Sequence, residues 1–119
     1  MITLYGIKNC DTMKKASRYC QDHSIEFRLH DYRVDGLDHA LLLLWVKELS
    51  WEALLNKRST SWRSLSDQIK NQINEASAIT AMLAHTSLIK RPLLEFEGRY
   101  LLGFSVEQYD AFFNDIKRV

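Results

Sequence analysis

The chain has 119 residues, which is enough for one domain with a core of its own. Sixteen basic and fifteen acidic side chains leave a net charge of +1, so neither nucleic acid nor an anionic membrane is an expected partner. The longest apolar run, ALLLLWV at 40–46, is far shorter than the ~20 residues of a membrane span. With two cysteines and no signal peptide pattern at the start, we expect a cytoplasmic protein with free thiols.

The N-terminal segment predicts a strand, a helix and a second strand. The apolar residues Ile2, Leu4 and Ile7 indicate a short, mostly buried strand. A helix is expected from Asp11 to about His23, because Met13, Ala16 and Cys20 recur at spacings of three and four and so share one face. Apolar and polar residues then alternate over 25–31, which is typical of a strand.

The middle of the chain predicts helices only. We expect a helix over 36–49, a short turn of helix at 51–55, a helix that contains Leu65, Ile69 and Ile73 and begins at Ser61 or Ser66, and a short helix over 76–84.

The last part predicts a β-hairpin and a final helix. In PLLEFEGRYLLGF, at 92–104, two apolar runs flank Glu97-Gly98, a two-residue hairpin turn. Ser105 and Gln108 form a capping box. The helix that follows has one apolar face, made of Tyr109, Phe112, Phe113 and Ile116.

The predicted order is β-α-β, then a helical block, then β-β-α. This order favours an α/β fold with a mixed four-stranded sheet. Without the block, it is the order of a thioredoxin-like domain. We therefore expect a single domain over 1–119, with a helical insertion over about 37–88, between the two halves.

Cys10 lies at the junction between the first strand and the first helix. A helix N-terminus carries about half a positive charge and several unpaired N–H groups, and both stabilise a thiolate. Lys8 adds a positive charge nearby. We therefore expect the pKa of Cys10 to lie below the ordinary ~8.5, which makes this residue the candidate nucleophile.

Cys20 has a different expected role. It lies in the apolar stripe of the helix, where a free cysteine is usually a small buried hydrophobe. Along a helix it would be about 15 Å from Cys10, whereas a disulfide needs Cα atoms within ~7 Å. Met13 stands where a C-x-x-C motif would carry its second sulfur. We expect an external thiol, with glutathione as the cytosolic candidate, to release Cys10.

No metal or bound cofactor is expected. The four histidines are scattered and have no spacing that would form a metal site.

Four segments carry a resemblance to a known family. TLYGIKNCDTMKKA at 3–16, HDYRVDGL at 30–37, WEALLNKRSTSWR at 51–63 and IKRPLL…LLGFS at 89–105 resemble the ArsC/Spx family, most closely its YffB branch. The motifs occur in the family order and span nearly the whole chain. The resemblance implies a thioredoxin-like fold with a helical insertion. It also implies a glutathione-dependent thiol reductase.

The resemblance assigns roles to individual residues. Cys10 matches the cysteine that attacks the oxyanion in the family's arsenate reductases, where glutathione resolves the product. Arg58 and Arg91 match two arginines that hold the substrate, and the planar guanidinium suits arsenate, a sulfenate or a glutathione carboxylate. Pro92 matches a cis proline that faces the cysteine. On the residues alone, Arg58 could instead be solvated and Arg91 could pair with a surface acid.

The chain also departs from the arsenate reductases. Gly6 and Ile7 stand where those enzymes carry His and Asn, and Gly103 stands where they carry a third arginine. Fewer cations weaken the case for a compact, doubly charged oxyanion. The departures therefore favour a glutathione mixed disulfide or another oxidised thiol over arsenate as the substrate.

Four functions stay open at this point. The leading one is a thiol oxidoreductase that acts with glutathione, and arsenate reduction is its variant. A protein of another class, a Spx-like regulator that binds RNA polymerase and responds to oxidation, is the alternative; such regulators typically sense through C-x-x-C, which Met13 interrupts. The last is a domain whose thiol is inert and reacts half-maximally only at about pH 8.5 or above.

Overall fold

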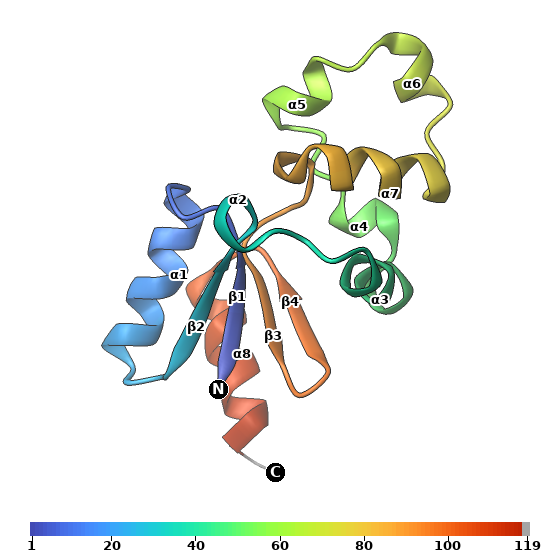
Figure 1. Cartoon of the computed structure of the whole chain (residues 1–119). Helices are drawn as coiled ribbons and strands as arrows, with labels where there is room; N and C mark the ends of the chain where they lie inside the picture. The colour runs from blue at the N-terminus through green and yellow to red at the C-terminus, as the bar shows by residue number, and fades with distance from the viewer. Residues whose placement is uncertain (118–119) are drawn as a thin grey trace. The chain divides into compact units, whose positions relative to one another are not determined.

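The sheet has four strands in the order β2-β1-β3-β4 (Figure 1). The structure is a computed structural model that describes residues 1–117, with side chains to residue 116. β1 (Ile2–Gly6) pairs in parallel with β2 (Phe27–Asp31) and antiparallel with β3 (Leu93–Phe96). β3 in turn pairs antiparallel with β4 (Arg99–Leu102). The mixed four-stranded sheet expected from the sequence is confirmed.

The register brings leucines together in the middle of the sheet. Leu4 of the central strand faces Leu29 of β2 on one side and Leu94 of β3 on the other. The turn between β3 and β4 is the predicted one, because both Glu97 and Gly98 have positive φ, as a two-residue hairpin turn of type I′ requires.

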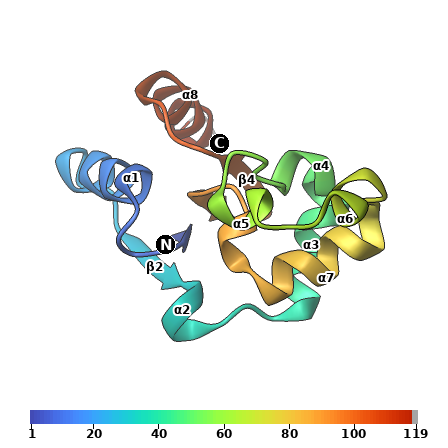
Figure 2. The same ribbon diagram turned by 90° about the horizontal axis from the view of Figure 1, so that it is seen from above.

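Two long helices pack on one face of this sheet (Figures 1 and 2). They are α1 (Asp11–Asp22) and α8 (Val106–Lys117). The hydroxyl of Ser105 accepts a hydrogen bond from the N–H of Gln108 at 3.1 Å, so the cap by Ser105 is confirmed, whereas the reciprocal bond of a capping box stays a prediction. The fully buried residues of this layer come from both helices and from the two central strands: Leu4, Met13, Ala16, Cys20, Leu94 and Tyr109.

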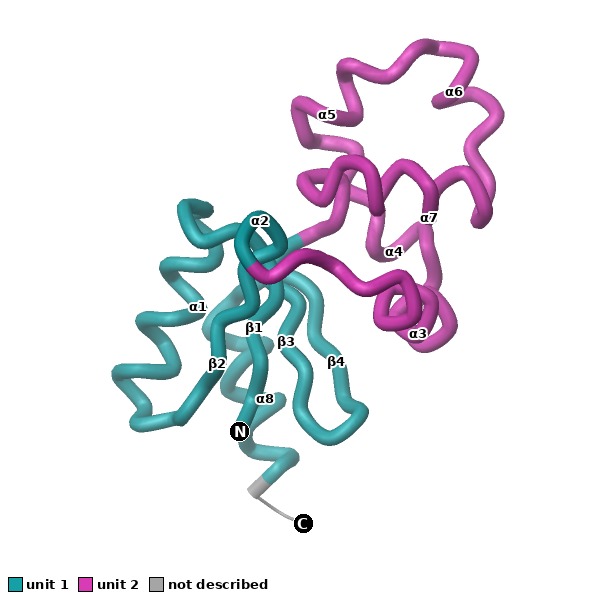
Figure 3. The backbone as a smooth tube through the Cα atoms, viewed as in Figure 1, with its two compact units in different colours: residues 1–34, 91–119 teal, residues 35–90 magenta. Residues whose placement is uncertain are grey.

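The chain divides into two compact units (Figure 3). The first consists of residues 1–34 and 91–119 and contains the sheet with α1 and α8. The second is the continuous segment 35–90. The expected helical insertion over about 37–88 falls within this second unit, whereas the single domain over 1–119 stays a prediction.

The second unit is almost entirely helical. It contains α3 (His39–Leu49), α4 (Trp51–Leu54), α5 (Thr60–Arg63), α6 (Asp67–Asn71), α7 (Glu75–Ala84) and a 3-10 turn (Thr86–Leu88). One short helix that was not expected, α2 (Tyr32–Asp35), directly follows β2, and all of it but Asp35 belongs to the first unit. The core of the second unit is built around the fully buried Leu42, Trp45, Leu54, Met82 and Leu88.

Two helix boundaries in this unit differ from the prediction. The helix expected from residue 36 begins only at His39, because Gly36 has a φ of +77° and the carboxylate of Asp38 caps the first turn. Of the single helix expected to contain Leu65, Ile69 and Ile73, only α6 is present and holds Ile69, while α5 ends before Leu65. Ser66 caps α6 as predicted, but α5 is capped by Ser59, so Ser61 is not a cap.

Within residues 1–117, no helix has the length and apolar character needed to cross a membrane.

Candidate active site at the start of α1

Cys10 occupies the N-cap position of α1. The turn after β1 closes through a 3.2 Å hydrogen bond from the N–H of Cys10 to the carbonyl of Ile7. The carbonyl of Cys10 then accepts from the N–H of Lys14 at 3.1 Å, which opens the helix. The backbone of Cys10 is extended, with φ −91° and ψ 136°, as N-cap residues usually are. The thiol therefore stands where serine or aspartate commonly caps a helix.

The thiol is half-buried and has hydrogen-bonding partners of its own. Its Sγ lies 3.0 Å from the hydroxyl oxygen of Thr12, and the Arg91 side chain also hydrogen-bonds to it. Partial burial raises the pKa of the Cys10 thiol, but the hydrogen bonds from Thr12 and Arg91, together with backbone N–H groups of α1, outweigh it. The resulting pKa is about 7, well below the ordinary value of a cysteine.

The backbone groups act at longer range than a capping bond. The N–H groups of Met13 and Thr12 lower the pKa of Cys10, although its side chain makes no capping hydrogen bond of regular geometry. We attribute the effect to N–H dipoles that point towards the sulfur from the open end of the helix. The expected link between the helix N-terminus and a depressed pKa is therefore present, with Thr12 and Arg91 as larger contributors.

Arg91 and Pro92 immediately precede β3, in the same unit as Cys10. The peptide bond between them is cis, as the resemblance implied. Pro92 is buried, and its carbonyl accepts a hydrogen bond from the N–H of Gly103 at 2.9 Å. Arg91 is half-buried, so its guanidinium can hydrogen-bond to the thiol and still lie near the solvent.

A buried carboxylate holds the loop that carries the cysteine. Asp31, at the end of β2, is 7% exposed, and among the residues that the structure describes it is the one charged side chain that is buried. Its two oxygens accept from the backbone N–H of Lys8 at 3.3 Å and from that of Arg33 at 2.9 Å. Sequence reasoning assigned Asp31 no role, because its contact with Lys8 depends on the pairing of β1 with β2. Thr12 was missed as well, although its place two residues after Cys10 was a signal.

Two further predicted site residues, Lys8 and Arg58, have exposed side chains. The side chain of Lys8 is exposed and lines a groove beside α1, while its backbone serves as the donor to Asp31. Arg58 is an exposed residue of the second unit, and its N–H donates to the side-chain oxygen of Asn56 at 3.1 Å. The anion-binding role of Arg58 stays a prediction.

The thiol of the second cysteine stays protonated at neutral pH. Cys20 is fully buried in the middle of α1, and burial raises the pKa of its thiol to about 11. The position that a second active-site sulfur would take is filled by the thioether of Met13, which is 1% exposed. Among the described residues, no group of histidine, cysteine and acidic side chains could hold a metal ion. The site thus offers one ionisable sulfur.

A model of the ArsC family matches residues 5–112. The chain belongs to the ArsC family. This match covers nearly the whole length, from β1 to α8, and so includes the junction that carries Cys10.

The relatives of this ArsC-family chain match nearly its whole length. A Haemophilus influenzae protein described as uncharacterised is 49% identical over 95% of this chain and 99% of its own. The global transcriptional regulator Spx of Lactiplantibacillus plantarum is 27% identical over 94% of this chain and 86% of its own.

Solved structures share the fold. A protein described as YffB is 44% identical with a TM-score of 0.88, covering 93% of this chain and 97% of its own. An arsenate reductase related protein of Brucella melitensis is 46% identical with a TM-score of 0.79, covering 94% and 93%. The fold is therefore that of the ArsC-type, thioredoxin-like proteins, as the sequence predicted.

Proposed function

We propose that this chain is a thiol oxidoreductase that uses Cys10 as its only nucleophile and glutathione as the thiol that releases it. The observation that carries the proposal is the place of the Cys10 thiol at the N-cap of α1, with the Thr12 hydroxyl 3.0 Å from its sulfur. These surroundings lower the pKa of Cys10 to about 7, so that roughly half of this thiol is ionised at neutral pH. A cysteine with an ordinary pKa would be only a few per cent thiolate there. The buried Cys20 supports an external resolving thiol, because it cannot attack a disulfide formed at Cys10.

The proposed reaction has two exchange steps. In the first, the Cys10 thiolate attacks the glutathione sulfur of a mixed disulfide R–S–S–G. The S–S bond of the mixed disulfide breaks, a new S–S bond joins Cys10 to glutathione, and R–S⁻ leaves and takes a proton. In the second, a glutathione thiolate attacks the bound glutathione sulfur, oxidised glutathione leaves, and the Cys10 thiolate is restored. In the net reaction, R–S–S–G and one glutathione thiol give R–SH and oxidised glutathione: one disulfide replaces another, the R sulfur is reduced to a thiol, and atoms, charge and electrons balance.

The other site residues support this chemistry in distinct ways. Arg91 donates to the Cys10 sulfur and can also pair with a carboxylate of the substrate. We assign Arg58 to a second anionic group of the substrate. Lys8 adds positive charge to the loop, and Pro92 fixes the chain beside Arg91. The reaction needs no bound cofactor, and a glutathione-rich cytosol is the compartment that would sustain it.

The test of the nucleophile is the covalent adduct. After incubation with oxidised glutathione, intact mass should show one bound glutathione on the native chain and on Cys20→Ala, and none on Cys10→Ser. A mixed-disulfide peptide should then be reduced in an assay in which glutathione reductase consumes NADPH. The proposal fails if Cys10 forms no adduct at any pH between about 6 and 9.

Arsenate serves as the second arm of the same assay. An arsenate reductase related protein is among the structural neighbours, which motivates the comparison. We expect the mixed disulfide to be turned over faster than arsenate, because Gly103 leaves the site without a third arginine. Arg91→Gln should slow the favoured reaction, whereas Arg99→Gln, which removes an exposed charge at the start of β4, should not.

A regulatory function of the Spx kind is the second candidate, since an Spx protein matches over 94% of the chain. It predicts binding to the C-terminal domain of the RNA polymerase alpha subunit, with an affinity that changes when Cys10 is oxidised. A pull-down with that domain, before and after treatment with oxidised glutathione, separates the two functions. If the chain retains the polymerase domain in the pull-down but does not reduce the mixed-disulfide peptide, the regulatory function is favoured.

A further inference from the structure

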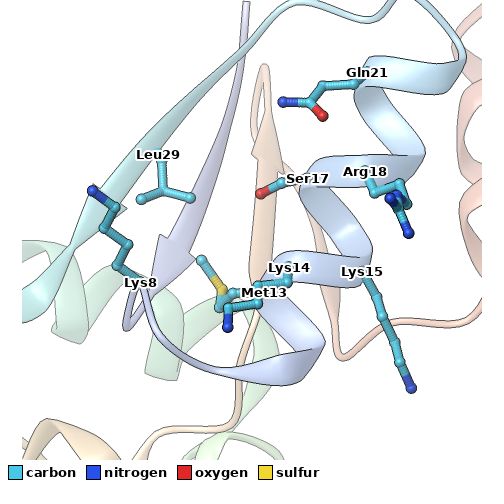
Figure 4. A pocket seen from close by; sticks show the side chains of 8 residues that line it. All are labelled: Lys8, Met13, Lys14, Lys15, Ser17, Arg18, Gln21 and Leu29. Carbon is cyan, nitrogen blue, oxygen red and sulfur yellow. The ribbon is translucent and has the colours of Figure 1, made fainter.

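A groove of about 530 Å³ runs between α1 and β2, beside the loop that carries Cys10 (Figure 4). Its side chains are Lys8 from the loop, Met13, Lys14, Ser17 and Gln21 from α1, and Leu29 from β2. In Figure 4, Ser17 and Gln21 point towards the strand, and Lys8 extends along it beside Leu29. We call this cavity the α1 groove.

The α1 groove concentrates positive charge. Lys8 and Lys14 flank it, Lys15 and Arg18 complete its lining, and none of the described residues that line it is acidic. All four cations are exposed, so a ligand can reach their charged ends from the solvent. The whole chain has a net charge of only +1, so this cluster is a local property and not the mark of a basic protein. The groove therefore favours an anionic occupant.

The size of the groove and the side chains that line it indicate which kind of anionic ligand it can bind. Met13 and Leu29 give it an apolar floor, while Ser17 and Gln21 offer neutral hydrogen-bonding groups. A volume in the range of small-ligand pockets is far larger than one oxyanion needs. Its lining, within the part of the chain that the structure describes, has no aromatic side chain to stack a base, which argues against single-stranded nucleic acid. An occupant with both carboxylates and an apolar group fits all these features.

The length of the groove suits a short peptide segment. From Lys14 to Gln21 the helix rises about 10 Å, which an extended peptide covers in about three residues. The groove also begins close to Cys10, because Lys14, which lines it, donates its backbone N–H to the carbonyl of Cys10 at 3.1 Å. A segment lying along α1 would therefore present a neighbouring cysteine to Cys10.

We propose that the α1 groove binds an acidic segment of a protein substrate, whose carboxylates pair with Lys8 and Lys14 and whose apolar side chain rests on Met13 and Leu29. The segment adjoins the substrate cysteine that Cys10 frees from glutathione. The reaction of this substrate with Cys10 rests on the proposed function, whereas its binding to the α1 groove does not. Each lysine acts as a specificity residue for the anionic flank.

Binding is tested without the chemistry. A labelled peptide that carries two glutamates and a leucine next to a serine, in place of cysteine, is compared by fluorescence anisotropy with its glutamine counterpart. We expect the acidic peptide to bind the full chain about tenfold tighter, and the difference to shrink as salt rises. Lys14→Gln should weaken it about fivefold, whereas Lys47→Gln, with the same net charge but on α3, should leave it unchanged.

Equal binding of the two peptides, or equal loss in Lys14→Gln and Lys47→Gln, overturns the proposal. So does displacement of the acidic peptide by a short oligonucleotide at lower concentration than by the unlabelled peptide, since the groove would then favour phosphates. Glutathionylated cysteine versions of both peptides report the reaction separately. If neither is turned over while the serine peptides still differ, the proposed function fails and the groove stands; if both are turned over at one rate and the serine peptides bind alike, only the groove fails.

Discussion

A methyl group at Gly6 would overlap the sulfur of Met13. Gly6 ends β1, and Met13 lies in the first turn of α1, so the strand and the helix meet with no room for a side chain between them. The same methyl would lie 3.2 Å from Cβ of Arg91, the residue that donates to the Cys10 thiol. Three elements of the candidate site thus converge on one glycine.

Gly6→Ala should therefore disturb both stability and reactivity. The flexible end of Met13 can move aside, but it is fully packed in the core, and Arg91 must shift as well. We expect the free energy of unfolding to fall by about 1–3 kcal/mol, as for other overpacked sites. The pKa of Cys10 should rise, because the N–H of Met13 and the Arg91 side chain both help to lower it. Urea denaturation and the pH profile of alkylation measure the two effects, and a variant unchanged in both would contradict the packing argument.

Thr12 offers a sharper test of what keeps Cys10 ionised. Thr12→Val keeps the shape of the side chain and removes the hydroxyl that lies 3.0 Å from the sulfur. A hydrogen bond to a charged group contributes about 1.5–3 kcal/mol, and one pKa unit corresponds to about 1.4 kcal/mol, so the pKa of Cys10 should rise by about one to two units.

The pH at half-maximal rate of iodoacetamide alkylation measures this shift. Thr12→Ser keeps the hydroxyl and serves as the matched control, for which we expect a value close to that of the native chain. If valine and serine variants react alike, Thr12 does not stabilise the thiolate.

The location of the reactive cysteine could be predicted, but its strongest partners could not. A strand, a short turn and an amphipathic helix follow one another along the chain, so the sequence itself places Cys10 at a helix N-terminus. Arg91 reaches the sulfur only because β3 pairs with β1, and that pairing depends on contacts far apart in sequence. The same holds for Asp31, which meets Lys8 through the pairing of β1 with β2.

The helical block shows where a periodic pattern misleads. Leu65, Ile69 and Ile73 recur at helical spacing, yet only Ile69 lies in a helix, because α5 ends at Arg63 and α6 covers Asp67–Asn71. Serine hydroxyls explain the break, since the side chains of Ser59 and Ser66 accept from the N–H groups of Trp62 and Ile69 and so begin a new helix each time. A segment with several serines offers more than one start, and packing decides among them.

Asp31 leads to a prediction about the loop that bears the cysteine. Asp31→Ala leaves the N–H groups of Lys8 and Arg33 without this acceptor in a part-buried position. We expect the free energy of unfolding to fall by about 1–3 kcal/mol and the alkylation of Cys10 to slow, because the loop loses its anchor. Asp31→Asn keeps one acceptor oxygen and should cost less.

Chemical denaturation monitors this series. Asp115→Ala, at an exposed position of α8, is the control and should change stability by no more than about 0.5 kcal/mol. An alanine variant at residue 31 that is as stable as this control would show that the carboxylate does not hold the loop.

The two cysteines should give the stability of the chain an opposite dependence on pH in two ranges. The pKa of Cys10 is about 7 in the folded chain and about 8.5 in the unfolded one, so between these values the unfolded state binds more protons and stability rises with pH. This contribution is complete above pH 8.5 or so and is lost as the pH falls through about 7. For Cys20, burial raises the folded pKa to about 11, so stability falls as the pH rises above about 8.5.

Cys10→Ser and Cys20→Ala separate the two contributions in urea denaturation between about pH 6 and 9.5. Cys10 is partly open to solvent, which screens its interactions, so its contribution should be at most about 1 kcal/mol. In Cys10→Ser, the free energy of unfolding should no longer rise between about pH 7 and 8.5 as it does in the native chain. In Cys20→Ala, it should no longer fall above about pH 8.5. If the stability of Cys10→Ser instead rises with pH as much as that of the native chain, the rise does not come from Cys10. The Cys10 thiol is then not ionised in the folded chain at neutral pH.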